Sequence, residues 1–251
     1  MKKLLFLLLI LTSLSTYSQG EANIWFFGRK AGIDFNTEPP TGLSNGETNT
    51  FEGCSSFADE NGNLLFYSDG ITVWDKNNDV MKYSNGDLAT FSGVPLTGNP
   101  SSTQSGMIIP KPGSSSIYYL FTVGDQSNPD FSFYTIDMSK NGGLGELIDE
   151  DGDGAFSVDL ATATGKKNTW TEKVTAVRGS VCNTFWVVSM SNNSFYAYKI
   201  DTTGVNLTPV ESIVSNASNN TRGYLKLSPD GSKLAVAHEN ATSQCFLYSF
   251  D

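Results

Sequence analysis

A strand-turn-strand unit recurs four times along this chain and constrains its fold more than any other feature. The clearest copy is LKLSPDGSKLAVA at 225–237, where two strand-forming runs flank Ser228-Pro229-Asp230-Gly231. Proline presets one backbone angle of a tight turn, and glycine supplies the positive angle that the reversal needs. The other copies are SSFADENGNLLFYSDG, MIIPKPGSSSIYYLFTVGD and VTAVRGSVCNTFWVVSMSN, at 55–70, 107–125 and 174–192.

Each unit is followed by a third run of strand-forming residues, at 71–75, 131–137, 194–201 and 244–251. Repeats of about 50 residues are typical of propeller blades. One small sheet cannot bury both of its faces, whereas copies stacked around an axis cover one another's faces. We therefore predict an all-β fold, a β-propeller of antiparallel blades with three to four strands each. We expect it to be incomplete, with about four blades and a lead-in strand, IWFFG at 24–28.

The first eighteen residues have the pattern of a secretory signal peptide. Lys2 and Lys3 are followed by an apolar run from Leu4 to Leu11 and by small residues before a cleavage site after Ser18. The apolar run is too short to span a bilayer. We therefore expect residues 1–18 to be removed, the propeller to occupy 19–251, and the mature chain to be exported to the periplasm, cell surface or medium without inserting into a membrane.

The net charge narrows the classes of possible partner, and the cysteine count bears on disulfide bonds. Removal of Lys2 and Lys3 leaves 14 basic against 26 acidic residues and changes the formal charge from −10 to −12, which disfavours nucleic acid as a partner. The three cysteines are too few for a disulfide scaffold. We interpret them as small buried apolar side chains, with one disulfide as the alternative. They are Cys54, Cys182 and Cys245.

Residue patterns of catalysis are sparse. The single histidine, His238, ends the strand-like run LAVAH, and we interpret it as structural. No nucleophile elbow of the G-x-S-x-G type and no H-E-x-x-H zinc motif occurs in the sequence. A glycosidase needs only two suitably placed acids, which a chain with 26 of them leaves open.

One acidic run has the residue spacing of a metal loop. Within an insertion at 138–170, Asp149, Asp151 and Asp153 alternate ahead of Gly154, as at the start of a calcium-binding loop. The twelfth position of such a loop is Leu160 here, where a bidentate glutamate is expected. We therefore name these three aspartates as candidate calcium ligands, with a solvated acidic turn as the alternative.

Several long segments of the chain resemble a known group of bacterial proteins. GEANIWFFGRKAGIDFN, at 20–36, is one of them, and TEKVTAVRG, at 171–179, and NTRGYLKLSPDGSKLAVA, at 220–237, continue the pattern. The longest, FEGCSSFADENGNLLFYSDGITVWDKNNDVM and SSTQSGMIIPKPGSSSIYYLFTV, lie at 51–81 and 101–123. Together they resemble the N-terminal propeller region of large exported, gliding-motility-associated proteins of gliding bacteria, which usually end in a type IX secretion sorting domain. The resemblance implies a WD-repeat-like propeller and export.

The chain departs from that family in two respects. Family members continue through further blades and a long tail, so we expect this sequence to be a fragment or a truncated product with an open blade edge available for self-association. The acidic insertion is longer than the family's usual connection. The calcium hypothesis therefore rests on the residues alone.

Two functions fit these observations. The first is a noncatalytic exported module that binds protein or glycan at the cell envelope or surface, in connection with gliding or type IX secretion. The alternative is a polysaccharide-active enzyme, which would show two carboxyl groups about 5–9 Å apart at the channel mouth beside an exposed Trp or Tyr.

We expect the aromatic side chains within the predicted strands to be mostly core residues. They are Trp25, Phe66, Tyr67, Trp74, Tyr119, Phe121, Phe185 and Trp186.

Overall fold

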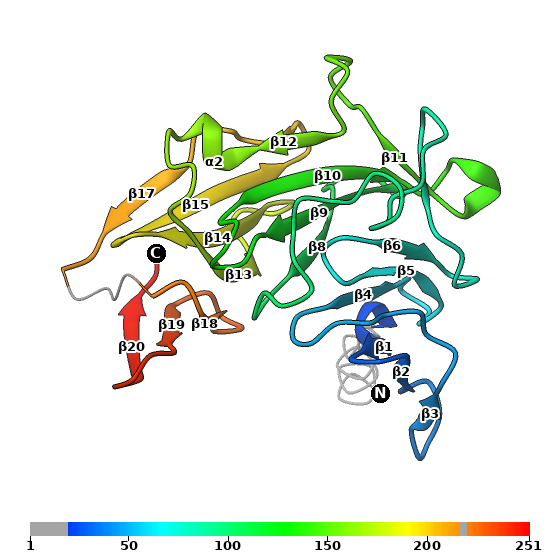
Figure 1. Ribbon diagram of the computed structural model, residues 1–251, viewed down its shortest axis with the longest axis horizontal. Helices are drawn as coiled ribbons and strands as arrows, with labels where there is room; N and C mark the ends of the chain where they lie inside the picture. The colour runs from blue at the N-terminus through cyan, green and yellow to red at the C-terminus, as the bar shows by residue number, and fades with distance from the viewer. Residues whose placement is uncertain (1–19, 216–219) are drawn as a thin grey trace, which may run out of the picture.

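The computed structural model describes residues 20–215 and 220–251, and its regular structure is almost entirely β-strand (Figure 1). Five sheets follow one another along the chain, antiparallel except for one strand pair, β7 and β11. The first sheet contains β1 (Ile24–Phe27), β2 (Ala31–Asp34) and β3 (Thr41–Leu43). The second contains β4 (Ser55–Ala58), β5 (Leu64–Ser68) and β6 (Val73–Asp75), and the fifth contains β18 (Gly223–Leu227), β19 (Lys233–His238) and β20 (Gln244–Ser249).

The third and fourth sheets are larger. The third has the order β7-β11-β10-β9-β8, with β12 also paired to β10, and the fourth has β13-β14-β15-β16, with β17 also paired to β15. The strands of the third sheet are β7 (Lys82–Tyr83), β8 (Gly106–Pro110), β9 (Ile117–Val123), β10 (Phe131–Asp137), β11 (Glu146–Ile148) and β12 (Ser157–Asp159). Those of the fourth are β13 (Trp170–Arg178), β14 (Phe185–Ser191), β15 (Ser194–Asp201), β16 (Gly204–Val205) and β17 (Val210–Ile213). The helices are short: η1 (Gly20–Ala22), η2 (Asn141–Gly143) and α2 (Leu160–Ala163).

The predicted strand-turn-strand repeat is confirmed. Its four hairpins are β4-β5, β8-β9, β13-β14 and β18-β19, and the third runs form β6, β10, β15 and β20. The predicted lead-in strand belongs to a three-stranded sheet, because β1 pairs with β2, which pairs with β3. Gly28 and Lys30 both have positive φ, of 57° and 61°, and so reverse the chain where the sequence shows no familiar turn motif.

Neighbouring sheets pack face to face and so divide the core into four clusters. The largest lies between the third and fourth sheets and contains Phe121, Phe131 and Trp170. The other three clusters join the first sheet to the second, the second to the third, and the fourth to the fifth. The leading strands of successive sheets also lie beside one another, most extensively β13 and β18. This succession of stacked meander sheets is an open, incomplete β-propeller.

The prediction of a largely buried aromatic set is confirmed with one exception. Phe66, Tyr67, Trp74, Tyr119 and Phe121 are buried, and Phe185 and Trp186 are half-buried. Trp25 was predicted wrongly, since its side chain is 50% exposed. Alternate residues of β1 point to opposite faces, and Trp25 lies on the face of the first sheet that is turned away from the second.

The predicted signal peptide, 1–18, lies outside the described residues. Among the residues that the structure does describe, no helix is both long enough and apolar enough to cross a membrane.

Candidate functional site

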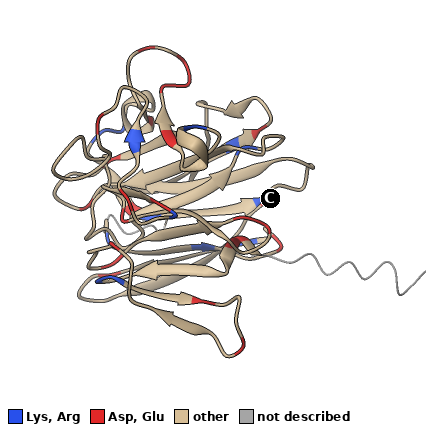
Figure 2. Cartoon of the chain, turned by 90° about the vertical axis from the view of Figure 1, so that its right-hand side faces the viewer, with Lys and Arg blue, Asp and Glu red and all other residues tan. Residues whose placement is uncertain are grey.

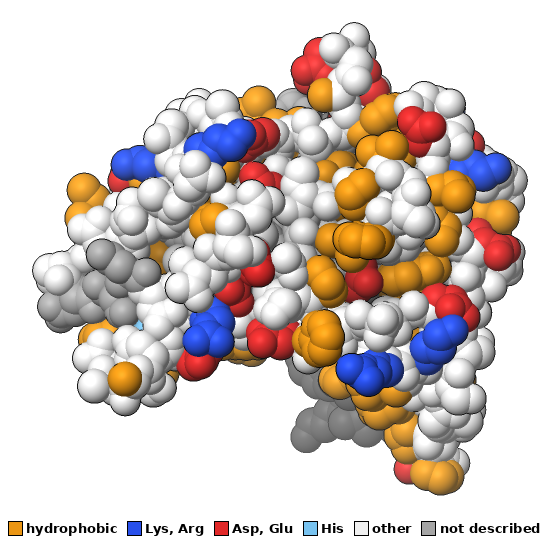
Figure 3. All heavy atoms as spheres, viewed as in Figure 1, with side chains coloured by type: hydrophobic (Ala, Val, Ile, Leu, Met, Phe, Trp, Pro, Cys, Tyr) orange, Lys and Arg blue, Asp and Glu red, His pale blue; other side chains and the backbone are white. Residues whose placement is uncertain are grey.

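The predicted insertion at 138–170 is partly built into the third sheet. Both β11 and β12 pair with β10, through Thr135 opposite Ile148 and Tyr134 opposite Ser157. Residues 149–156 therefore leave the edge of the sheet and return to it at neighbouring positions. They form a projecting acidic loop, which stands out at the top of the molecule in Figures 1 and 3 and whose ribbon has the red of Asp and Glu in Figure 2.

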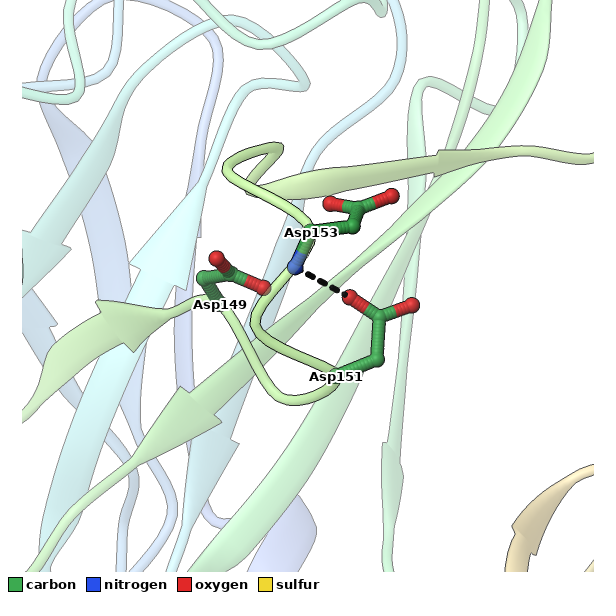
Figure 4. Close-up of side chains that lie close together, drawn as sticks. All are labelled: Asp149, Asp151 and Asp153. Atoms are coloured by element: carbon green, nitrogen blue, oxygen red, sulfur yellow. Dashed lines mark hydrogen bonds between the residues drawn. The ribbon is translucent and has the colours of Figure 1, made fainter.

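The acidic loop brings the three predicted aspartates together. Asp149, Asp151 and Asp153 each have a carboxylate oxygen within 4.8 Å of the others (Figure 4). The main-chain N–H groups of Gly154 and Gly152 each donate to Asp149 at 2.8 Å. These hydrogen bonds, led by the one from Gly154, lower the pKa of Asp149. The loop thus holds a compact set of oxygen donors of the kind that suits a hard cation.

The second half of the predicted calcium loop does not close around the aspartates. Leu160, at the twelfth position, begins α2 and is buried. Asp159 caps that helix, because its carboxylate accepts hydrogen bonds from the Thr162 N–H at 2.8 Å and the Thr162 hydroxyl at 2.6 Å. Only the first half of the motif therefore gathers ligands. The calcium hypothesis stays a prediction. An acidic turn that binds no ion would show the same hydrogen bonds from its own main chain.

A second group of charged side chains lies buried near the leading strands. The Glu172 carboxylate accepts hydrogen bonds from the N–H and hydroxyl of Thr103 and from the N–H of Gln126, all at 3.1 Å. The adjacent Lys173 is fully buried and donates to the carbonyls of Asn220 and Thr221 at 2.9 and 2.8 Å. Burial lowers the pKa of Lys173 to about 8. These groups join the third, fourth and fifth sheets.

Sequence reasoning missed this buried pair. Its only signal was the two charged residues in succession inside the strand-like run WTEKVTAVR, now β13. In an alternating strand one of two successive residues must face inward, and both are buried here because the leading strand is surrounded by neighbouring sheets.

A cleft of about 450 Å³ opens beside this buried pair. Glu52 and Thr103 line it from one side, and Tyr224 and Glu239 line it from the fifth sheet. Tyr224 is half exposed, and Glu239 pairs with the Arg222 guanidinium at 3.2 Å. Two carboxylates and an exposed tyrosine thus share one cleft.

His238 also lines the cleft but is itself buried, on the face of β19 that carries Leu234 and Val236. Its ring packs edge-on against Phe246 at 5.9 Å. Burial and then the charge of Lys173 lower the pKa of His238, while the Asn220 carbonyl partly opposes them. A buried ring among apolar side chains agrees with the interpretation of a structural histidine.

The cysteines are free, and our interpretation of them as buried side chains was wrong for two of the three. Cys182 and Cys245 are exposed, and Cys54 is partly buried. Cys182 lies in the turn between β13 and β14, and Cys245 lies on the outward face of β20.

The comparisons with known proteins concern the fold alone. No protein-family model matches the sequence, and no curated protein matches it. A functionally unknown protein from Desulfotomaculum acetoxidans is similar in structure, with a TM-score of 0.44 and 12% identity over 91% of this chain and 62% of that one. The Dos1 propeller is similar with a TM-score of 0.34 and 12% identity, over 88% of this chain and 64% of that one.

The chain therefore spans less than two thirds of either solved structure. At this similarity the assignment to the propeller class rests on the succession of stacked sheets. The resemblance to exported proteins of gliding bacteria stays a hypothesis.

Proposed function

We propose that this chain is a noncatalytic, exported propeller module that binds a protein or a glycan at the cell envelope or surface. The signal-peptide pattern at 1–18 supports export, and the resemblance to gliding-motility-associated proteins supports a role beside gliding or type IX secretion. The formal charge of −12 that remains without Lys2 and Lys3, from 14 basic and 26 acidic residues, favours partners that are neutral or basic.

The observation that carries the proposal is that the buried charged groups serve a structural role. Glu172 and Lys173 hold the main chain and side chains of neighbouring sheets together through five hydrogen bonds. A general acid or base must reach the reacting atoms of a substrate, whereas these groups are enclosed within the sheet junction. Their arrangement supports a rigid scaffold that presents loops, as propeller binding modules do.

The experiment is a binding measurement with the intact chain. Purified protein would be passed over immobilised polysaccharides and immobilised surface proteins from a gliding bacterium, and its retention measured by biolayer interferometry. We expect saturable retention on at least one surface. Retention on none would contradict the proposal.

A second function is favoured by one specific feature, the cleft between Glu52 and Glu239. Paired carboxylates beside an exposed aromatic side chain are the arrangement that a polysaccharide-active enzyme would need, and Tyr224 supplies the aromatic ring. Against this role, Glu239 is already paired with Arg222.

A further inference from the structure

The cleft of about 450 Å³, between the fifth sheet and the segments that precede β4 and β8, has an apolar floor. Tyr224, Ala237 and Cys245 lie opposite one another on β18, β19 and β20, so their side chains share one face of the fifth sheet. Tyr224 is 51% exposed, and Cys245 is exposed too. The floor is therefore a short apolar strip that stays open to solvent.

The walls of the cleft carry negative charge. Glu52 lines it from one side and Glu239 from the fifth sheet, and no lysine or arginine is among the described residues that line it. Oε2 of Glu239 pairs with Arg222. The Glu52 carboxylate, in contrast, forms no hydrogen bond or ion pair with the described part of the chain. Glu52 is therefore free to bind a cation from outside.

The basic groups beneath the cleft are already paired or neutral. Lys173 packs under Gly223, with its Cε 3.0 Å from the position that a Cβ atom would occupy there. Its ammonium donates to the carbonyls of residues 220 and 221, and the adjacent Glu172 carboxylate opposes its charge. The pKa of His238, which lines the cleft, is lowered from 6.5 chiefly by burial, so the ring is neutral at pH 7.

A cleft of this composition suits an arginine side chain. The aliphatic stem of a basic residue can lie along an apolar strip while its charged head reaches a carboxylate. A guanidinium binds a carboxylate through two parallel N–H groups and stacks on an aromatic ring. Glu52 and the exposed ring of Tyr224 supply these two partners in one cleft.

We propose that this cleft is the site at which the module binds its partner, and that the partner is a protein segment with an exposed arginine that contacts Glu52 and the ring of Tyr224. The inference rests on the proposed function and chooses a protein partner over a glycan. A basic side chain uses both the charge of Glu52 and the net negative charge of the chain, whereas a neutral glycan uses neither.

Two fluorescently labelled peptides would be titrated with the intact chain by fluorescence anisotropy. Both alternate glycine and serine, and one carries two arginines where the other carries two citrullines, which have nearly the same shape and no charge. We expect the arginine peptide to bind at least about tenfold more tightly, because charge-assisted hydrogen bonds are stronger than neutral ones. Equal affinity for the two peptides, or binding of neither, would overturn the proposal.

Three variants test the residues of the cleft. Glu52→Gln removes the free carboxylate, and Tyr224→Leu removes the ring but keeps an apolar side chain. Glu60→Gln makes the same charge change in the exposed turn between β4 and β5, outside the cleft, and is the control. We expect the affinity for the arginine peptide to fall about tenfold in Glu52→Gln and about two- to fivefold in Tyr224→Leu, and to stay unchanged in Glu60→Gln. Equal affinities of the two glutamate variants would mean that the cleft does not hold the peptide.

Two exposed cysteines locate the bound peptide without a mutation. Cys245 lies in the floor of the cleft, whereas Cys182 lies outside it, in the turn between β13 and β14. N-ethylmaleimide would be added with and without the arginine peptide, and the modification of each thiol followed by mass spectrometry. We expect saturating peptide to slow the modification of Cys245 severalfold and to leave Cys182 unchanged. An unchanged rate at Cys245 would place the peptide outside the cleft and overturn the assignment.

The retention test on surface proteins and polysaccharides separates this site from the proposed function. We expect retention on a surface protein to fall with rising salt and in Glu52→Gln, but not in Glu60→Gln. Retention on a surface protein that Glu52→Gln leaves unchanged would make this site wrong and the binding function right. Retention on a polysaccharide that falls in Glu52→Gln and in Tyr224→Leu, without a preference for the arginine peptide, would assign the cleft to a glycan. Retention on neither kind of surface would contradict the proposed function itself.

Discussion

The side-chain amide of Gln104 forms two hydrogen bonds with the main chain of Leu225, 121 residues further along the chain. Its Nε2 donates to the Leu225 carbonyl at 3.2 Å, and its Oε1 accepts from the Leu225 N–H at 2.8 Å. The Gln104 side chain therefore bonds to the main chain of β18 as a neighbouring strand would. It joins the segment that leads into β8 to the fifth sheet.

Replacement of Gln104 by leucine should destabilise the fold measurably. The variant keeps the approximate volume but leaves the buried N–H and C=O of Leu225 without partners, at about 1–3 kcal/mol for each group. Urea unfolding would give the difference in the free energy of unfolding. Gln244→Leu, at an exposed position on β20, should stay within about 0.5 kcal/mol of wild type. Equal stability of the two variants would mean that the Gln104 bonds do not hold the sheets together.

The fold was largely predictable because the sequence signals that specify it lie within short segments. The turn SPDG and the alternating runs beside it specify a hairpin, and repetition of that hairpin specifies stacked sheets. The Gln104 bonds to Leu225 were not predictable, because side-chain bonds between distant segments leave no periodic pattern. The same holds for the first sheet, whose turn at Gly28 and Lys30 depends on two positive φ angles that no familiar motif signals.

The candidate site was predictable only in part. The spacing of Asp149, Asp151 and Asp153 correctly indicated that their carboxylates gather, because successive short turns place alternate side chains together. A cavity of about 160 Å³ that Asp151 lines could not be foreseen. It is formed by strands of two sheets and the turn at Gly204, which only tertiary packing brings together.

Replacement of Phe121 by alanine should cost about 3–5 kcal/mol. Phe121 is fully buried, and its ring lies 5.3 Å from that of Phe133 and 6.0 Å from that of Phe131. The control is Phe91→Ala, which makes the same change at a side chain that is 78% exposed. Thermal melting should show a large loss for Phe121→Ala and almost none for the control. An unchanged melting temperature for Phe121→Ala would contradict the assignment of this ring to the core.

The stability of the fold should depend on pH through Lys173. Folding lowers the pKa of its ammonium from 10.5 to about 8, so between these values the unfolded chain binds the proton more tightly. The free energy of unfolding should therefore rise with pH from about 8 to 10.5, by about 3 kcal/mol, and this contribution should be level below pH 8.

The comparison with Lys173→Met isolates this contribution, because other titrating groups cancel. The difference in unfolding free energy between wild type and Lys173→Met should grow with pH across that window. Ser189→Ala removes a neutral hydroxyl that donates to the Lys173 carbonyl, and its difference from wild type should not vary with pH. A constant difference for Lys173→Met would show that the ammonium is not desolvated.

The outer faces of the first and fifth sheets should cause the chain to self-associate. Trp25 is half exposed on the first, and Leu247 is 70% exposed on the fifth. Exposed apolar sheet faces and free strand edges favour association. Light scattering over a range of concentrations should show oligomers, and Trp25→Lys combined with Leu247→Lys should shift them toward monomer. Phe91→Lys, on a loop, is the control. A wild-type protein that is monomeric at every concentration, with cooperative melting, would refute this prediction.

The most direct test of the proposed function is to measure retention and cleavage on the same polysaccharide. The protein would be incubated with each polysaccharide that retains it, and new reducing ends would be counted for wild type and for the double variant Glu52→Gln with Glu239→Gln. A binding module should retain the polysaccharide and release no more reducing ends than the double variant does. Release by wild type that disappears in the double variant, while retention persists, would contradict the account and identify the cleft at Glu52 and Glu239 as a catalytic site.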